Sequence, residues 1–528
     1  MAEAEPRDEL PGVVEVGAGS SVEFCEPSDR WSPASVVLGC LLVALILAGT
    51  SLLIRPAKSV VDEPITEDSY YALSVSRSMA DGGGVTIDGV HPTNGFQPLF
   101  TLMGSVAFLL TPDDVSAIRL VLLLHLVVWL SCAWLVSLIV ADWVSAEGNR
   151  RRVIRLATAV LFLGAAYIVH VGFNGLETLL ALLGYLGIWR FVQVSRLESV
   201  QSGVVLGLIA GVTVLARIDA VFVVGALFVF LVLKRGWRPA VSMAVVAGAV
   251  SAPWWIYNYV EFGSLMPTSG QALWELRLYY SERRAKAVVS GVGDVILPWA
   301  FAGRLQSFGI SLGKLMVAAA VLGAAWLLPP KEAALKGPRM VNARAFGYVL
   351  LAASAGIVVW YGLTSKAEWF YYRYFAPISL LMIVVLAVGL ARTSRGWRPA
   401  FLNVAAIVVG LSGLMSFGVL WNSQLSGGNE MLNDQVALVR GTVPDDQVVA
   451  AGQSGTLGFW RAKVVNLDGK VNPDVLRIET SMSDYLRSQD IHWLCDWPDY
   501  VQGYLGKQPT GDGWKLVGRK GRFECWHR

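Results

Sequence analysis

The feature that most restricts the fold of this chain is a series of long apolar segments. The first, Val36 to Ile54, has nineteen residues without a charge. A helix needs about 20 apolar residues to cross a bilayer, and this run is too long for the core of a signal peptide. Ten further runs lie near 118–142, 153–171, 176–195, 201–216, 219–233, 239–257, 308–328, 345–363, 376–391 and 399–421. The sequence therefore predicts a polytopic α-helical membrane protein with about eleven transmembrane helices.

The composition supports this interpretation. Of the 528 residues, 54% are hydrophobic and 16% are charged, whereas about 25% are charged in an average soluble protein. These values exclude a disordered chain, a collagen-like chain and an ordinary soluble enzyme. The formal net charge of +3 gives no argument for binding nucleic acid.

The distribution of Lys and Arg predicts the orientation, because cytoplasmic loops are enriched in these residues. With the N-terminus in the cytoplasm, the inner loops carry the cations near 150–152, 190–196, 234–238, 331–344 and 392–398. This alternation requires Pro98 to Leu110 to be a helix lying in the outer interface. The alternative is a true span there, with one other helix miscounted.

The domain boundaries follow from these segments. We expect a disordered cytoplasmic tail at 1–34 and a transmembrane catalytic domain at 35–421, with a first outer loop at 55–117 and a long outer loop at 258–307. Residues 422–528 have ordinary soluble composition. Strands are predicted at 447–451 and 463–467, helices at 430–440 and 481–487, and a hairpin at 514–526. This small α/β domain falls outside the membrane if the number of spans is odd.

Two of the five cysteines fall in the predicted outer domain. Cys495 and Cys525 lie thirty residues apart, and an oxidising compartment favours a disulfide between them. Two buried thiols are the alternative. A metal site with His492 and His527 is a weaker one, because no zinc-ligand spacing is present.

Polar residues collect at the joints that the topology places outside. Ionisable groups at membrane depth are costly and usually face a cavity, so six such segments on one side predict one shared polar site. The segments are 62–70, 88–95, 174–178, 217–219, 267–271 and 366–374.

Each of these segments also has a structural interpretation. Glu67 and Asp68 could cap a helix, Arg217 and Asp219 could pair with each other, and Arg373 could reach the membrane interface. Together, however, the set is chemically coherent. A carboxylate can act as a general base toward a hydroxyl, and Arg and Lys stabilise phosphate oxygens. Aromatic rings suit sugar faces, so these are the parts needed for sugar transfer from a polyprenyl-phosphate donor.

The outer segments also resemble a known superfamily. Glu67 to Tyr71, followed by His91 to Leu99, resembles the first outer loop of GT-C glycosyltransferases, above all family-39-like enzymes and mycobacterial terminal arabinofuranosyltransferases. Asn174 to Thr178 is similar to their GLET element. Leu215 to Asp219 is similar to L-x-R-P-D with Ile218 in place of Pro, Pro267 to Ser269 to a P-N-T loop without its Asn, and Arg373 to Pro377 to R-Y-F-x-P.

The resemblance implies an inverting glycosyltransferase of GT-C fold in the inner membrane of a bacterium, with its site on the outer face. Asp68 would be the general base, and Glu67 or Glu177 would orient the acceptor hydroxyl. Cations would hold the donor phosphate, and further polar and aromatic groups would contact substrate. These sets are Arg217, Arg373 and Lys366 for phosphate, and His91, Asn94, Asp219, Thr268, Gln271, Tyr372 and Tyr374 for substrate.

Several alternatives stay open at this point. No cofactor is required, although a divalent metal could bind Glu67 and Asp68. The donor sugar could be arabinofuranose, mannose, glucose or galactofuranose, and the acceptor a glycan, lipid or protein of the cell envelope. The rival functions are a transporter or flippase of a lipid-linked or polar substrate, a scaffold, and a ligase that uses diphosphate donors.

Overall fold

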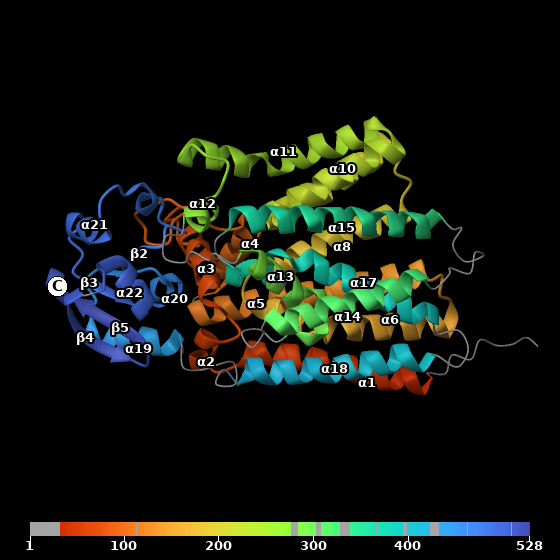
Figure 1. Cartoon of the computed structure of the whole chain (residues 1–528), viewed down its shortest axis with the longest axis horizontal. Helices are drawn as coiled ribbons and strands as arrows, with labels where there is room; N and C mark the ends of the chain where they lie inside the picture. The colour runs from red at the N-terminus through yellow and green to blue at the C-terminus, as the bar shows by residue number, and fades with distance from the viewer. Residues whose placement is uncertain are drawn as a thin grey trace, which may run out of the picture.

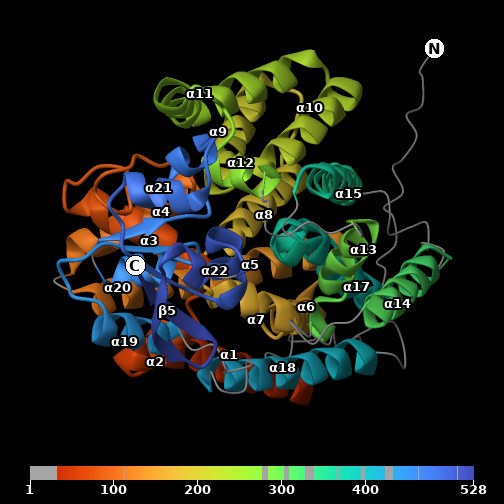
Figure 2. The same cartoon turned by 60° about the vertical axis from the view of Figure 1, so that its left-hand side comes forward.

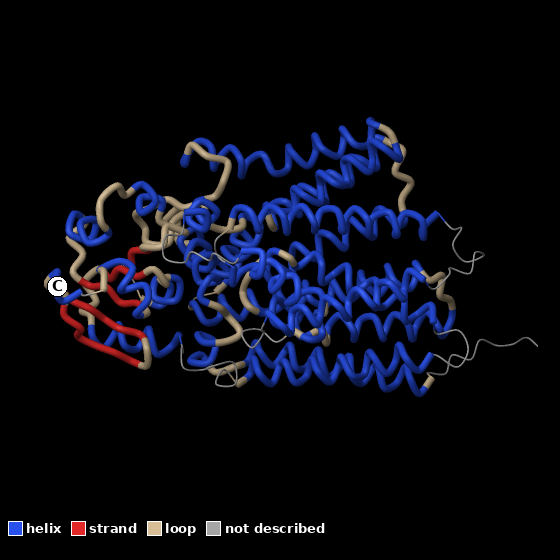
Figure 3. The backbone as a smooth tube through the Cα atoms, viewed as in Figure 1, coloured by secondary structure: helices blue, strands red, loops and turns tan. Residues whose placement is uncertain are grey.

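The computed structural model describes residues 32–111, 113–275, 284–301, 308–327, 338–365, 368–393, 399–422, 432–461, 463–507 and 509–528. Residues 1–31 of the predicted tail lie outside the described residues. Long helices run side by side through most of the molecule, and the C-terminal domain lies at one end of them (Figure 1). Strands are confined to that end (Figure 3).

Within the described residues, the eleven predicted apolar runs each lie largely on α-helices. These are α1 (Pro33–Ser51), α5 (Asp114–Trp143), α6 (Gly148–Leu163) with α7 (Ala166–Phe173), α8 (Thr178–Val194), α9 (Val200–Ala216), α10 (Val221–Arg235), α11 (Trp237–Phe262), α14 (Phe308–Leu327), α15 (Pro338–Thr364), α17 (Ala376–Thr393) and α18 (Pro399–Trp421). Among the described residues, five helices are long and apolar enough to cross a membrane, or six if α6 and α7, bent by 63°, form one span. The chain is an integral membrane protein, and the number of spans stays a prediction.

The helices pack around a continuous apolar core, although many of their outer side chains are exposed. Trp129, Phe162, Tyr167 and Trp189 are fully buried, whereas Leu47 is 63% and Met415 is 74% exposed. Exposed apolar side chains of this kind are stable where lipid covers them, because the core of a bilayer excludes polar groups and accepts apolar ones.

Short helices connect the long ones on the side of the C-terminal domain. After α1 come α2 (Ala57–Asp62), α3 (Glu67–Ala80) and α4 (Pro98–Leu110); after α11 come α12 (Thr268–Glu275) and α13 (Arg284–Ile296); after α15 comes α16 (Tyr371–Tyr374). The bounds of α4 are those predicted for the interfacial helix. At 1.5 Å per residue, its 13 residues reach about 20 Å, too short for a bilayer core of about 30 Å.

The C-terminal domain is built on a five-stranded sheet of order β2-β1-β3-β5-β4. Its strands are β1 (Val449–Ala451), β2 (Val464–Asn466), β3 (Trp493–Asp496), β4 (Lys515–Lys520) and β5 (Phe523–His527). β1 is parallel to β2 and β3, and the remaining pairs are antiparallel. The helices are α19 (Leu432–Thr442), α20 (Gly455–Trp460), α21 (Met482–Ser488) and α22 (Pro498–Leu505), so each predicted strand, helix and hairpin of this domain is present.

The sequence did not predict β3, the strand that joins the parallel and antiparallel parts of the sheet. All four of its residues are buried, so it lacks the alternating pattern of a half-exposed strand. Cys495 on β3 lies opposite Cys525 on β5, and the structure joins them in a disulfide.

The C-terminal domain contacts the connecting helices directly. Helix α20 lies against α3, and Figure 2 shows it from the side of the domain. The rings of Tyr70 on α3 and Phe459 on α20 are 5.2 Å apart. This contact sets the start of α3 between the membrane helices and the sheet.

Candidate active site

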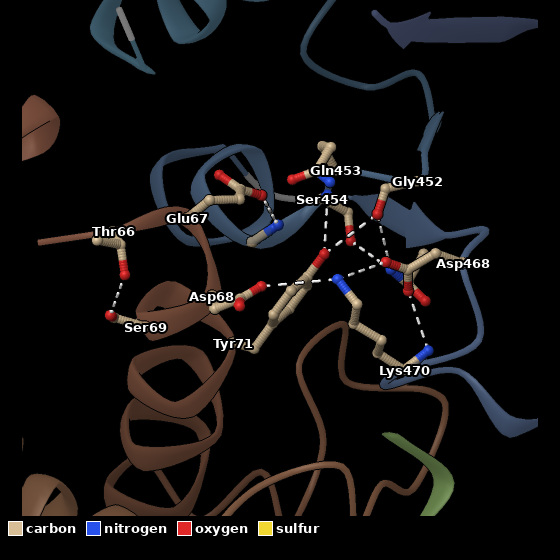
Figure 4. A network of polar contacts seen from close by, with 12 residues as sticks. Thr66, Glu67, Asp68, Ser69, Tyr71, Gly452, Gln453, Ser454, Asp468 and Lys470 are labelled. Carbon is tan, nitrogen blue, oxygen red and sulfur yellow. Dashed lines mark hydrogen bonds and ion pairs between the residues drawn. The ribbon is translucent and has the colours of Figure 1, made fainter. Parts of the chain in front are cut away.

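Glu67 and Asp68 lie in the first turn of α3, where the helix dipole favours carboxylates. Neighbouring residues of a helix are rotated by about 100°, so the two side chains leave α3 in different directions. Figure 4 shows Glu67 turned toward the start of α20 and Asp68 turned toward Lys470. The two acids therefore have different partners.

Glu67 binds the C-terminal domain. Its carboxylate accepts hydrogen bonds from the N–H groups of Gly455 at 2.6 Å and Thr456 at 3.1 Å, and from the Thr456 hydroxyl. Burial raises the pKa of Glu67, and the hydrogen bonds from Thr456 oppose that rise. The geometry makes Glu67 a link between α3 and α20.

Asp68 lies between two cations from different parts of the chain. Its Oδ2 is 2.7 Å from Nη1 of Arg373, on α16. Its Oδ1 is 3.6 Å from Nζ of Lys470, in the C-terminal domain. Lys470 Nζ is also 3.1 Å from Oδ2 of Asp468, so Asp68 joins the membrane part of the site to the C-terminal domain.

The predicted residues of the membrane part continue this arrangement. Arg373 Nη2 is 4.0 Å from Oε1 of Glu177, and that oxygen accepts a hydrogen bond of 2.7 Å from Arg217. Arg217 donates two further hydrogen bonds, of 3.1 and 2.5 Å, to Asp219. Arg217, Glu177 and Asp219 are all buried.

These contacts form one series of ion pairs in which carboxylates and cations alternate. We call it the ion-pair chain; its members are, in order, Asp468, Lys470, Asp68, Arg373, Glu177, Arg217 and Asp219. The first and last members are carboxylates, so the fully ionised ion-pair chain carries one more negative than positive charge.

The turn before α8 brings Glu177 toward α3. The carbonyl of Asn174 accepts hydrogen bonds from the Thr66 N–H at 3.2 Å and from the Ser69 hydroxyl. Gly175 has φ +76°, and a Cβ there would lie 2.9 Å from the Ser69 Cβ. Glycine is therefore required both for the backbone conformation and for the close approach.

Two of the predicted aromatic residues differ in role. The Tyr374 ring stacks on Tyr361 at 3.8 Å with 6° between the planes, and Arg217 lies 5.5 Å above its centroid. The Tyr361 hydroxyl donates to Asp219 at 3.2 Å. Tyr372 accepts a hydrogen bond of 2.8 Å from Tyr167 through its backbone carbonyl. Tyr374 thus borders the ion-pair chain, whereas this contact of Tyr372 supports the backbone.

Asn94 and Thr268 support the loop that carries Lys470. Asn94 accepts a hydrogen bond of 2.8 Å from the Thr268 N–H and donates one of 3.1 Å to Asn258. The Thr268 hydroxyl donates to the Lys470 carbonyl at 3.1 Å. Their observed contacts are with other parts of the protein, so they position a loop of the site.

His91 and Gln271 lie away from the ion-pair chain. His91 Nδ1 is 2.6 Å from Asp88, and Nε2 is 3.7 Å from Asp474. The hydrogen bond with Asp88 raises the pKa of His91. Gln271 donates to the Met266 carbonyl at 3.0 Å. Among the described residues, neither side chain forms a hydrogen bond or ion pair with a member of the ion-pair chain. Lys366 lies outside the described residues.

The pair predicted as possible ligands of a divalent metal, Glu67 and Asp68, has other partners in this structure, and such a metal stays a prediction. The Asp68 oxygens face two cations, and the Glu67 oxygens accept N–H and O–H groups. Among the described residues, no group of three or more His, Cys, Asp or Glu side chains could hold a metal ion.

Sequence reasoning did not find Lys470 or Asp468. The stretch Asp468-Gly469-Lys470 has the composition of a surface turn, yet Lys470 is buried and Asp468 has a side chain only 4% exposed. The two opposite charges of this turn are buried because the turn contacts Thr268 and Asp68. The sequence of the turn does not show these contacts, so it does not show the burial either. Within the sequence, only the Asp-Gly pair gave a signal, and it indicates a turn without indicating its partner.

Comparisons with known proteins identify the fold. No family model and no curated protein matches the sequence. Among solved structures, ArnT from Cupriavidus metallidurans bound to undecaprenyl phosphate is similar, with a TM-score of 0.56 and 14% identity over 93% of this chain and 97% of that chain. The archaeal oligosaccharyltransferase AglB from Archaeoglobus fulgidus, in complex with an inhibitory peptide and a dolichol-phosphate, has a TM-score of 0.50 and 13% identity over 92% of this chain and 74% of that chain.

At sequence identities this low, the similarity to these two structures concerns the fold alone. Both similar structures are GT-C glycosyltransferases, and the match to ArnT extends over nearly all of both chains. It therefore extends over most of the helical bundle and most of the C-terminal domain. The chain accordingly has the GT-C fold, as its outer segments predicted.

Proposed function

We propose that the protein is an inverting glycosyltransferase that moves a sugar from a polyprenyl-phosphate donor to a hydroxyl of the cell envelope, with Asp68 as the general base. The observation that carries this proposal is the position of Asp68 within the ion-pair chain. The Asp68 side chain is partly exposed, whereas the carboxylates of Glu177 and Asp219 are buried against Arg217. Of these carboxylates, Asp68 is the one best placed to meet a substrate.

The charge of the ion-pair chain supports a base at this position. With all seven groups ionised there is one surplus negative charge, and a proton taken up by Asp68 restores the balance. Buried networks are most stable when their charges are paired. A proton accepted by Asp68 therefore leaves the seven groups with equal numbers of positive and negative charges.

The same site supplies cations for the donor. When the acceptor oxygen attacks C1 of the sugar, the bond from C1 to the phosphate oxygen breaks, and its electron pair stays on the phosphate. Preorganised cations are well suited to stabilise such developing charge. Arg373, which touches Asp68, is the nearest candidate on the membrane side, and Arg217 lies one step further along. No general acid is required, because phosphate is a good leaving group.

The similar structures support this choice of donor. ArnT was solved bound to undecaprenyl phosphate, and AglB was solved with a dolichol-phosphate and an inhibitory peptide. We extend the lipid-phosphate chemistry to this chain and place the site and the C-terminal domain on the outer face of a bacterial inner membrane. Arabinofuranose and mannose are the first donor sugars to test, and the step uses no cofactor.

The test is a donor panel on the purified full chain in nanodiscs. Polyprenyl phosphates carrying arabinose, mannose, glucose or galactose are supplied with an envelope extract as acceptor, and release of polyprenyl phosphate is measured. We expect turnover of one donor and a loss of about 100-fold or more in Asp68→Asn, the usual range for a general base. Asp474→Asn, an exposed acid outside the ion-pair chain, is the matched control and should keep full activity.

Two outcomes would change the proposal. Turnover that survives in Asp68→Asn would retain the reaction but reject Asp68 as the base. If no donor is turned over while the lipids move between leaflets, the enzyme proposal fails and the transporter alternative takes its place.

A further inference from the structure

The two oxygens of Asp68 face cations that come from opposite sides of the site. Arg373 belongs to the membrane domain, whereas Lys470 belongs to the C-terminal domain. Both cations also lie over one ring: the Phe370 centroid is 5.3 Å from the Arg373 guanidinium carbon and 5.3 Å from Lys470 Nζ. Their charged groups therefore converge on one place beside Asp68.

The environment of Lys470 keeps its side chain charged and directed. Burial acts to lower the pKa of Lys470, but Asp468 and Asp68 outweigh that effect and raise it well above its usual value. The ring of Tyr71 lies 5.7 Å from Nζ, and cation–aromatic contacts add to the stabilisation. Figure 4 shows the amino group between Asp68 and Asp468.

Three separate segments fix the backbone of Lys470. Its N–H donates to Asp468 at 3.0 Å, and its carbonyl accepts from Thr268 at 3.1 Å. A Cβ on Gly95 would lie only 1.9 Å from the same carbonyl, so the first connecting loop approaches it as closely as a glycine permits. The first loop, α12 and the C-terminal domain thus meet at this residue.

We propose that Lys470 is the contribution of the C-terminal domain to the catalytic centre, and that its amino group contacts the phosphate of the lipid-linked donor. This inference rests on the proposed function. During transfer the acceptor O–C1 bond forms, the C1–O bond to phosphate breaks, the hydroxyl proton passes to Asp68, and the electron pair passes to the phosphate. Asp68 loses its charge as the phosphate gains one, so Arg373 and Lys470 exchange their contact with Asp68 for one with the phosphate, while Lys470 keeps its contact with Asp468.

A purely structural role makes a different prediction. If Lys470 only holds the C-terminal domain in place, its loss weakens binding of every ligand of the cavity alike. If it contacts phosphate, its loss weakens the binding of phosphate-bearing lipid and leaves the binding of the matching alcohol unchanged. The two roles can therefore be separated by a pair of lipids that differ only in the phosphate.

The experiment measures binding of undecaprenyl phosphate and of undecaprenol to the full chain in nanodiscs. For Lys470→Met we expect a 10- to 100-fold loss for the phosphate, roughly what a charged hydrogen bond contributes, and no change for the alcohol. Lys470→Arg should retain most of the affinity because it keeps the charge. Lys520→Met is the matched control, since Lys520 pairs with Asp434 on the surface of the same domain, and it should bind both lipids as the wild type does.

The charge-balanced variant Lys470→Met/Asp468→Asn guards against misfolding, because it leaves no unpaired Asp468. Its thermal unfolding should match that of the wild type, and it should show the same selective loss. Equal binding of the phosphate by wild type and by both folded variants would overturn the role of Lys470, as would an equal loss for both lipids. Absence of turnover and of phosphate binding in the wild type would instead overturn the proposed function.

Discussion

The contacts on the two sides of Asp68 are built differently. On the membrane side, Arg217 is buried between Glu177 and Asp219 with hydrogen bonds to both. On the side of the C-terminal domain, the cation is a lysine held by a turn. A guanidinium is a planar, always charged group with fixed hydrogen-bond directions, whereas an ammonium is a compact charge on a flexible stem. We infer that the hydrogen bonds of Arg217 fix the membrane side, whereas on the C-terminal side the Lys470 side chain, on a backbone that is itself fixed, can turn toward a ligand.

The largest predicted effect is the loss of stability when the charge of Arg217, on the membrane side, is removed. Arg217→Met leaves buried Asp219 without its cation and Glu177 with only the longer contact to Arg373, and removal of one partner from a buried pair destabilises a protein by about 3–5 kcal/mol. Thermal or denaturant unfolding of the full chain in detergent measures this change. Arg344→Met is the matched control, because Arg344 is exposed, donates from its Nε to the Tyr348 hydroxyl and lies over the ring of the same residue, and surface changes usually stay within about 0.5 kcal/mol. An Arg217 variant as stable as the control would mean that these charges are not paired as the structure shows.

A smaller effect is expected where the C-terminal domain docks. Glu67→Gln replaces one acceptor oxygen by an NH₂ group that faces the N–H groups of α20. Losing a charged hydrogen bond of this kind costs about 1–3 kcal/mol. Hydrogen exchange at Gly455 and Thr456 should accelerate by roughly tenfold or more, while the helices of the membrane side keep their protection.

The control for this docking contact is Glu479→Gln, at an exposed position of the same domain. It should leave exchange in α20 unchanged. If Glu67→Gln also left it unchanged, the hydrogen bonds of Glu67 would not hold the domain. The two sides of the site would then be coupled only through Lys470.

The two sides also differ in how far the sequence predicted them. The outer joints of a helical bundle meet on one face, so alternating apolar runs were enough to group Asp68, Glu177, Arg217 and Arg373. The bounds of α4 followed from the same pattern, since Pro98 opens the helix and the backbone is extended at Thr111, directly after Leu110. Local sequence signals and membrane topology thus determine the membrane side.

The contribution of the C-terminal domain depends on packing between distant segments. Lys470 reaches Asp68 across about four hundred residues of chain, and no local pattern encodes that approach. The different contacts of Glu67 and Asp68 also depend on packing between distant segments. Adjacent acids look equivalent in sequence, but rotation around α3 sends one to α20 and the other to the ion-pair chain. Predicted roles of His91 and Gln271 in substrate binding rest on the resemblance alone, because both have other contacts in the structure.

The last predicted effect, the smallest when counted per pH unit, is a dependence of the C-terminal side on pH. Asp496 is fully buried at the end of β3 and accepts hydrogen bonds from Gly452 at 2.6 Å and Trp497 at 2.8 Å. Burial, the largest cause, raises the pKa of Asp496 to about 7, from 3.8. Because the folded state holds this proton more tightly than the unfolded state, the stabilisation is complete below pH 3.8 and is lost as the pH rises toward 7.

Linkage sets the size of this loss at no more than about 1.4 kcal/mol per pH unit within that window. We expect hydrogen exchange of β1 and β3 to accelerate between pH 5 and pH 7 in the wild type and to change less in Asp496→Asn, which cannot ionise. Asp484→Asn, at an exposed and ion-paired position of α21, should keep the wild-type dependence. An unchanged slope in Asp496→Asn would assign the pH response to another group, with Glu67 the next to test because its pKa is also raised by burial. A slope confined to these strands would show that the adjustable side of the site is also the side that responds to protons.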